Sequence, residues 1–137
     1  MSNYDKYIKY KTKYLQLKGG DVKEIHVNEP WFTFIKDGVK KVEGRLNKGM
    51  FSNIKKDDTI IWFNIDKNTR QKRQVKTKVT KIATYKTFED MLRTEELNNV
   101  LPKIKDYVEG VNVYRQWYDE QGEKKFGVLA IHLSTQD

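Results

Sequence analysis

This chain of 137 residues contains no cysteine and only two prolines. The absence of cysteine excludes disulfide bridges, cysteine-ligated zinc sites and thiolate nucleophiles. The two histidines, His26 and His132, lie far apart in the sequence and neither stands in a carboxylate-rich motif, so we expect no metal site and no other cofactor. No apolar run approaches the ~20 residues needed to cross a bilayer, and the N-terminus lacks the apolar core of a signal peptide. We therefore expect a soluble, intracellular protein that does not insert into a membrane.

Basic residues outnumber acidic ones, with 27 Lys and Arg against 19 Asp and Glu, so the net charge is +8. Aromatic residues make up 12% of the chain, and they supply the bulky core material that a disordered chain would lack. The length is that of one compact domain with a short appendage, and we expect it to act as a monomer. The excess of positive charge predicts a polyanionic partner such as a nucleic acid.

The first 20 residues form a separate basic segment. They contain five lysines against Asp5 alone, so about a seventh of the chain carries half of the net charge. The apolar positions of this segment recur at three- and four-residue steps: Tyr4, Tyr7, Ile8, Tyr14 and Leu15. This spacing predicts a basic amphipathic leader helix that ends at Gly19-Gly20. Three interpretations stay open: a marginal helix that packs loosely, an anchor for nucleic acid or a membrane surface, and a targeting or processing segment.

The third interpretation of the leader comes from a resemblance. Residues 1–20 resemble the short Tyr/Lys-rich leaders of many large-DNA-virus (giant-virus) proteins, and Leu17-Lys18-Gly19-Gly20 is similar to the double-glycine sites of ubiquitin-like-protein proteases. The resemblance implies a viral protein in the host cytoplasm, the viral factory or the virion. It also implies a processing protease that cleaves at Gly19-Gly20, and an intact N-terminal Met1 or Ser2 on the natural protein would contradict that cleavage.

From Asp21 onward the pattern predicts five strands and several short helices. The strands are expected at residues 23–28, 39–45, 59–65, 72–85 and 126–133. Helices are expected after Pro30, after the Thr87–Asp90 capping pair and after Asn112, and Gly122 is expected to turn the chain into the last strand. The strands and helices do not alternate as βα units, so we expect an α+β fold over residues 21–137 in which a five-stranded sheet closes into a small barrel.

One short motif carries most of the functional information. Residues Gly38 to Arg45 read GVKKVEGR, which has the form GxKxxExR, and a Pro-Trp-bearing helix is expected just before it. Ile54–Trp62 after the motif and the terminal block Gly127–Ile131 complete the pattern. Over about residues 23–133 the sequence resembles the ASCH domain of the PUA-like superfamily. The resemblance implies a small β-barrel flanked by helices, a cleft beside the motif strand, and a role in RNA- or nucleotide-linked chemistry.

The motif side chains suit contacts with a nucleotide. Lys40 can meet a phosphate, Glu43 can accept hydrogen bonds from a base edge, and the planar fork of Arg45 can bind phosphate or stack on a base. In a regular strand Glu43 and Arg45 share one face and Lys40 points to the other. Lys40 can join them if it lies in the loop ahead of the strand, so we expect it at the rim of the cleft. The alternative is that Glu43 and Arg45 pair within the barrel and only hold its register.

Aromatic and basic residues elsewhere extend the predicted site. The candidate base-stacking platforms are Trp31, Tyr85, Tyr114, Trp117 and Tyr118, although most of these residues are needed in the core. The cations of the hairpin and the strand after it are candidates to follow a phosphate backbone: Lys67, Arg70, Lys72, Arg73, Lys76 and Lys78. The alternative for the hairpin is a solvated tip without a ligand.

The resemblance also raises the question of catalysis. Some ASCH relatives are small amidohydrolases that remove an acyl group from modified cytidine, and others are reported as ribonucleases. The amidohydrolase pattern implies a Lys, a Thr three positions later and a Glu further along the chain. Lys40 matches the Lys, but Glu43 stands at the position of the Thr. Only Glu95 and Glu96 could supply the later carboxylate. In an enzyme, Lys40 and Glu43 would be the catalytic pair. We favour a binding module, with a hydrolase of either type as the alternative and a virion or assembly component with a passive ASCH domain as a third.

Overall fold

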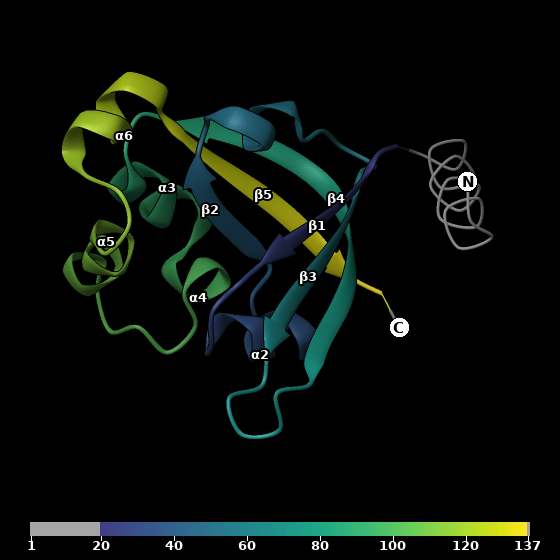
Figure 1. Cartoon of the computed structure of the whole chain (residues 1–137). Coiled ribbons are helices and arrows are strands. Elements are labelled where there is room, and N and C mark those ends of the chain that lie inside the picture. Colours follow the sequence, from purple (N-terminus) through teal and green to yellow (C-terminus); the bar gives the residue numbers. More distant parts are fainter. Residues whose placement is uncertain (1–19, 137) are drawn as a thin grey trace.

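The computed structural model describes residues 20–136, so nearly all of the predicted leader helix lies outside the described residues. Five strands form one sheet in the order β1-β3-β4-β5-β2, in which β1 pairs with β3 in parallel and all other pairs are antiparallel. Their bounds are β1 (Val22–His26), β2 (Val42–Leu46), β3 (Thr59–Ile65), β4 (Lys72–Tyr85) and β5 (Val128–Thr135). The sheet curls into a partial barrel with β1 and β2 as its two edges (Figure 1). The predicted five-stranded α+β fold is confirmed.

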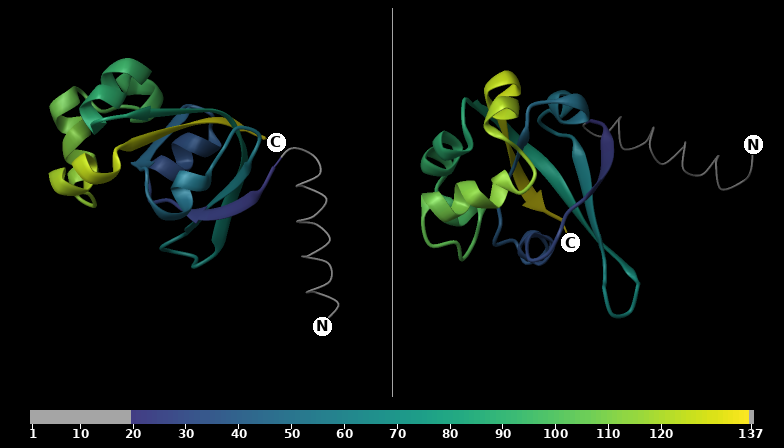
Figure 2. Two further views of the ribbon diagram at one scale, coloured as in Figure 1. Left: turned by 90° about the horizontal axis from the view of Figure 1, so that it is seen from above. Right: turned by 60° about the vertical axis from the view of Figure 1, so that its left-hand side comes forward.

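The helices gather mainly on one side of the sheet (Figure 2). Their bounds are α2 (Trp31–Lys36), α3 (Phe88–Glu95), α4 (Leu97–Val100), α5 (Tyr107–Arg115) and α6 (Glu120–Phe126), and a 3-10 helix spans Gly49–Asn53. Helices α3 to α6 lie together beyond one end of the barrel, whereas the β3–β4 hairpin projects away from them. Among the described helices none is long and apolar enough to cross a membrane.

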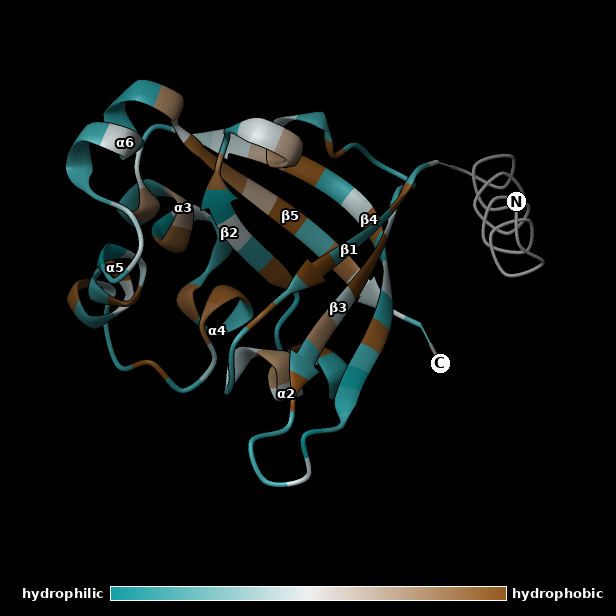
Figure 3. Ribbon diagram, viewed as in Figure 1, coloured by the Kyte–Doolittle hydropathy of each residue, from teal (hydrophilic) through white to brown (hydrophobic). Residues whose placement is uncertain are grey.

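The strand β5 separates two hydrophobic cores. Leu129, Ile131 and Leu133 point into the barrel, where they pack with residues of β1, β3 and α2. Val128 and Ala130 point the other way, toward the core that α3 and α5 form against β2. Both faces of β5 are covered along its first part, and its first four residues, Val128 to Ile131, are all apolar, as the hydropathy colouring shows (Figure 3).

Three sequence predictions of local structure are wrong. Residues 59–65 read TIIWFNI, and so continuous an apolar run predicts a strand buried on both faces. The burial of β3 instead alternates, and Ile61, Phe63 and Ile65 line an outer face that stays partly exposed. Helix α5 begins at Tyr107 because the Asp106 side chain accepts the Glu109 N–H at 2.9 Å, so Asn112 lies inside the helix and is not its cap.

The third wrong prediction concerns the turn before the last strand. Gly122 lies within α6, whose N-cap Asp119 accepts the Gly122 N–H at 2.7 Å. The chain instead turns into β5 at Gly127, which has a φ of 75°. Strand β2 also begins three residues later than expected, because the N–H groups of Val39 and Lys40 both donate to the Phe34 carbonyl at the end of α2.

Candidate functional site

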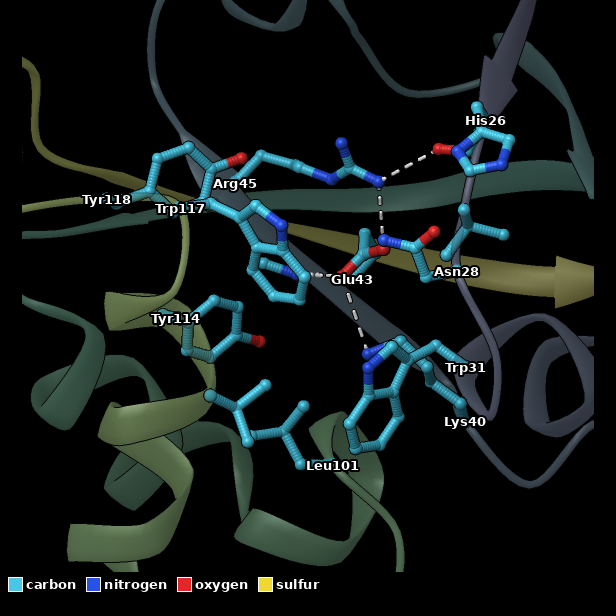
Figure 4. A pocket seen from close by; sticks show the side chains of 13 residues that line it. His26, Asn28, Trp31, Lys40, Glu43, Arg45, Leu101, Tyr114, Trp117 and Tyr118 are labelled. Atoms are coloured by element: carbon cyan, nitrogen blue, oxygen red, sulfur yellow. Dashed lines mark hydrogen bonds and ion pairs between the residues drawn. The ribbon is translucent and has the colours of Figure 1, made fainter.

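A pocket of ≈ 190 Å³ lies where the sheet edges β1 and β2 approach each other, and we call it the central pocket. One wall is the motif strand β2 with the residues ahead of it. The end of β1 and the start of α2 form the second wall, and α5 with the turn after it forms the third (Figure 4). The polar and aromatic side chains that line it include Trp31, Lys40, Glu43, Arg45, Tyr114 and Trp117.

Lys40 lies ahead of β2, as predicted, and its side chain turns toward Glu43. The predicted position at the rim is wrong, because Lys40 is only 1% exposed. Its ammonium donates to the carbonyls of Val42 (2.9 Å) and Val100, and it lies 3.5 Å from Glu43 Oε1. Burial lowers the pKa of Lys40, and the Glu43 carboxylate opposes that shift. All three ammonium protons therefore have protein acceptors, so Lys40 holds the pocket wall rather than reaching a ligand.

Glu43 stands at the centre of the charged group. Its Oε1 accepts the Gly44 N–H at 2.9 Å, and its Oε2 lies 3.4 Å from Arg45 Nη2. A carboxylate offers about four acceptor positions, so these contacts leave acceptor capacity on Oε2. Burial raises the pKa of the Glu43 carboxyl, but the Lys40 and Arg45 cations and the Gly44 N–H outweigh it and hold the pKa below its ordinary value. Glu43 is therefore an ionised acceptor at neutral pH.

Arg45 joins the two edges of the barrel. Its guanidinium donates to the His26 carbonyl of β1 at 3.3 Å while it pairs with Glu43 on β2. It also lies over the ring of Phe51 at 5.1 Å and over that of Trp62 at 5.8 Å. Glu43 and Arg45 thus pair with each other, and the pair still lines the central pocket.

Tyr114 brings an unpartnered hydroxyl to the pocket. Its ring stacks on Phe88 at 4.2 Å, the residue is 4% exposed, and among residues 20–136 its hydroxyl has no hydrogen-bond partner. Figure 4 shows the hydroxyl turned toward the space between Glu43 and Trp31. A Cβ on Gly44 would lie 2.8 Å from this oxygen and 2.6 Å from Met91 Cε, so the glycine permits the close approach. Burial, with the nearby Glu43 charge, raises the pKa of Tyr114 well above its ordinary value, so the hydroxyl keeps its proton.

The comparisons agree with the predicted family. The model of the ASCH domain family matches residues 25–136. The chain belongs to the ASCH-domain family. The archaeal hypothetical protein PH0355, which has a crystal structure, is 41% identical in sequence to this ASCH protein. The two structures match with a TM-score of 0.74, and the match covers 84% of this chain and 99% of that one. The solution structure of protein PF0455 from Pyrococcus furiosus is 37% identical, with a TM-score of 0.68 over 85% of this chain and 98% of that one. No match was found among curated proteins.

The structure does not bring every predicted residue of the ASCH domain into the pocket. Tyr85 lies elsewhere, and its hydroxyl donates to Glu95 at 2.8 Å. Burial and this carboxylate raise the pKa of Tyr85 to about 12. Glu95 also contacts His132 Nε2 at 2.9 Å, so it is not the pocket carboxylate that the amidohydrolase pattern implies.

The lining of the central pocket contains most of the predicted stacking residues and also apolar residues that were not predicted. Trp31, Tyr114, Trp117 and Tyr118 all reach the central pocket, so four of the five predicted platforms lie together. Leu101 and Val113 also line it, and sequence reasoning missed them. Apolar side chains of this kind carry no chemical signal that separates a pocket wall from an ordinary core.

The six cations predicted to follow a phosphate backbone fall into two groups. Arg73 contacts Glu29 at 3.1 Å and Asn64 at 2.8 Å, and Lys72 pairs with Glu24, so both are held by the protein. The other four cations are exposed, and within the described part of the chain they have no ion-pair partner: Lys67, Arg70, Lys76 and Lys78. These four stay available to a polyanion.

The ionised state of Glu43 makes a prediction about stability and pH. Its pKa is lowered from 4.5 in the folded protein, so its carboxylate stabilises the fold fully above that value. The stabilisation is lost as the pH falls through the lowered folded-state pKa. We expect the difference in unfolding free energy between the wild type and Glu43→Gln to be constant above about pH 5 and to shrink as the pH falls below that range. Urea unfolding at a series of pH values measures this; a difference that does not change with pH would contradict it.

Proposed function

We propose that this ASCH protein binds single-stranded nucleic acid, RNA in the first instance, and encloses the base of one nucleotide in the central pocket. The main support is a mismatch in hydrogen bonding. The Tyr114 hydroxyl has no partner among the described residues, and Glu43 Oε2 retains acceptor capacity in the same pocket. A buried polar group without a partner destabilises a protein by about 1–3 kcal/mol. A ligand that supplies both partners would remove that penalty.

The size and walls of the pocket fit a planar base. Its volume of ≈ 190 Å³ is smaller than the roughly 300–1,000 Å³ of sites for drug-sized ligands. Trp31 and Trp117 supply aromatic surface on its walls, and Trp117 is 51% exposed. Stacking of a base on an aromatic ring contributes about 1–3 kcal/mol.

The polar groups fit the edge of a base rather than a free phosphate. Glu43 is ionised and therefore only accepts, so it suits an exocyclic amine or a ring N–H. The Tyr114 hydroxyl keeps its proton and can donate to a ring nitrogen or a carbonyl. A phosphate inside the pocket would lie close to the Glu43 carboxylate, and the Arg45 cation that would offset the repulsion is already paired with that carboxylate. Lys67 of the hairpin lies outside the pocket and lines a neighbouring hollow with Trp31 and Trp117, where a backbone would continue. Lys76 and Lys78 lie on β4, the middle strand of the sheet, and so away from the pocket between its two edges.

The same contacts favour binding over hydrolysis. All three protons of Lys40 have protein acceptors, and the pKa of Glu43 lies below its ordinary value. A general base works best when its pKa is near the working pH. Neither residue is therefore placed or tuned as the catalytic pair that an amidohydrolase or ribonuclease would need.

The proposal is tested with Tyr114→Phe and Glu43→Gln. The binding of short single-stranded RNA and DNA of each base is followed through tryptophan fluorescence and calorimetry. Loss of a neutral hydrogen bond predicts about 3- to 10-fold weaker binding for Tyr114→Phe, and loss of the charged acceptor predicts at least about tenfold for Glu43→Gln. Tyr114→Phe removes a hydroxyl that has no partner among the described residues, so the unfolding free energy of this variant should not fall below that of the wild type.

Tyr85→Phe is the matched control, because it removes a tyrosine hydroxyl outside the pocket. It should lose some stability with its Glu95 hydrogen bond but keep wild-type affinity. Two outcomes would overturn the proposal: wild-type protein that binds none of the oligonucleotides, which would favour the passive role, or binding that neither pocket variant weakens.

The predictions that depend on residues 1–20 are separate from this site. A viral origin, a location in the host cytoplasm, viral factory or virion, and cleavage at Gly19-Gly20 stay predictions, as does the monomeric state.

A further inference from the structure

A second hollow adjoins the central pocket and shares two of its walls. It has a volume of ≈ 460 Å³ and is lined by Phe51, Phe126, Met50 and Lys48 together with Trp117 and Tyr118. Trp117 and Tyr118 also line the central pocket. We call this space the flanking hollow. Because Trp117 and Tyr118 line both spaces, the flanking hollow is the immediate neighbour of the central pocket.

The two phenylalanines of the flanking hollow come from distant parts of the chain. Phe51 belongs to the 3-10 helix after β2, and Phe126 is the last residue of α6. The backbone of Asn47 donates to the Gly127 carbonyl at 3.0 Å and ties the two segments together. Phe51 packs partly on the barrel core and Phe126 on the helical core, while both also line the hollow. The hollow is therefore built by the fold and does not depend on a free loop.

Cations accompany these rings. Lys48 Nζ lies 5.0 Å and Lys125 Nζ 5.2 Å from the centre of the Phe126 ring. Arg45 lies over the Phe51 ring, between the central pocket and the hollow. Asp119 is the acidic residue of this hollow, and its Oδ1 already accepts the Gly122 N–H. Aromatic surface with cations over its rings offers stacking area for a base and positive charge for its phosphate.

We propose that the flanking hollow is a second base site, which takes the nucleotide next to the one in the central pocket. This inference rests on the proposed function. It makes the ligand a strand of at least two nucleotides. Trp117, which is half-exposed and lines both spaces, stands at the junction between the two bases.

The experiment compares nucleoside monophosphates with dinucleotides of the same bases, both as RNA and as DNA. On the wild-type protein a dinucleotide should bind about tenfold or more tightly than the monophosphate, because a second base stacks. Phe51→Leu and Phe126→Leu keep apolar bulk but remove the rings. Each should reduce that gain at least about threefold. Phe126→Leu, whose ring does not lie under Arg45, should also leave monophosphate affinity unchanged. Phe63→Leu, on the outer face of β3 and away from the hollow, is the matched control and should not change the gain from monophosphate to dinucleotide.

The outcomes separate this inference from the proposed function. Equal affinities for monophosphate and dinucleotide, or a gain that both Phe51→Leu and Phe126→Leu retain, would overturn the second base site and leave the central pocket standing. Tyr114→Phe should weaken monophosphate and dinucleotide alike. If wild-type protein binds neither probe, the proposed function falls and the second site falls with it. Thermal unfolding of the leucine variants shows whether each remains folded during the titration.

Discussion

Replacing Lys40 with methionine is expected to lower the free energy of unfolding by about 3–5 kcal/mol. The change leaves the buried Glu43 carboxylate with Arg45 as its remaining cation, at 3.4 Å from Oε2. It also removes the donor to the carbonyls of Val42 and Val100, so the link between β2 and the end of α4 is lost. Methionine keeps most of the apolar stem, so the loss reports on the charge and its hydrogen bonds. Urea unfolding at neutral pH measures the effect.

Two further variants make this prediction specific. Lys41→Met changes the neighbouring lysine, which is exposed, and should alter stability by no more than about 0.5 kcal/mol. Glu43→Gln should destabilise the Lys40→Met protein less than it destabilises the wild type, because the Lys40 partner of the carboxylate is already gone. Equal effects of Lys40→Met and Lys41→Met would show that the buried ammonium does not stabilise the pocket wall.

Glu123→Ala is expected to lower the free energy of unfolding by about 3 kcal/mol. Glu123 is 6% exposed; its Oε2 accepts the Phe88 N–H at 2.8 Å, and its Oε1 lies 3.0 Å from Arg115 Nη2. One carboxylate of α6 thus holds the start of α3 and the end of α5. Its loss leaves a buried N–H without an acceptor and Arg115, whose Nη1 has no partner in the described region, without its counter-charge.

Glu123→Ala is also expected to weaken nucleotide binding. Trp117 and Tyr118 lie in the turn between α5 and α6, so a loosened α6 should displace two walls of the central pocket and weaken nucleotide binding. Glu120→Ala, on the exposed side of the same helix, is the control and should change stability by no more than about 0.5 kcal/mol. A loss for Glu123→Ala no larger than for Glu120→Ala would contradict the role of this carboxylate.

Much of the candidate site could be predicted because its main residues are close in sequence. The alternation of a strand places Glu43 and Arg45 on one face whatever surrounds them. Gly38, with a φ of 75°, ends the helix before the motif and leaves Lys40 outside the strand. The depth of Lys40 was not predictable, because its acceptor Val100 lies sixty residues away.

Aromatic residues likewise differ in ways that depend on distant parts of the chain and not on the local sequence. Tyr85 and Tyr114 look alike in the sequence, yet one donates to Glu95 outside the pocket and the other points into it without a partner among the described residues. Helix α5 decides this difference, because it begins at Tyr107 rather than after Asn112 and so sets which face Tyr114 presents to Gly44. Local propensity cannot supply that information.

The linear pattern of residues was sufficient for the positive charge, which is a sum over the chain, and for the family, the five strands and the three motif side chains, which are recognised from local patterns. The folded arrangement alone determined the burial of Lys40, the unpartnered Tyr114 hydroxyl and the two hollows that meet at Trp117. These features arise where β1, β2, α5 and α6 come together from distant parts of the chain, and burial and hydrogen bonding depend on what packs there.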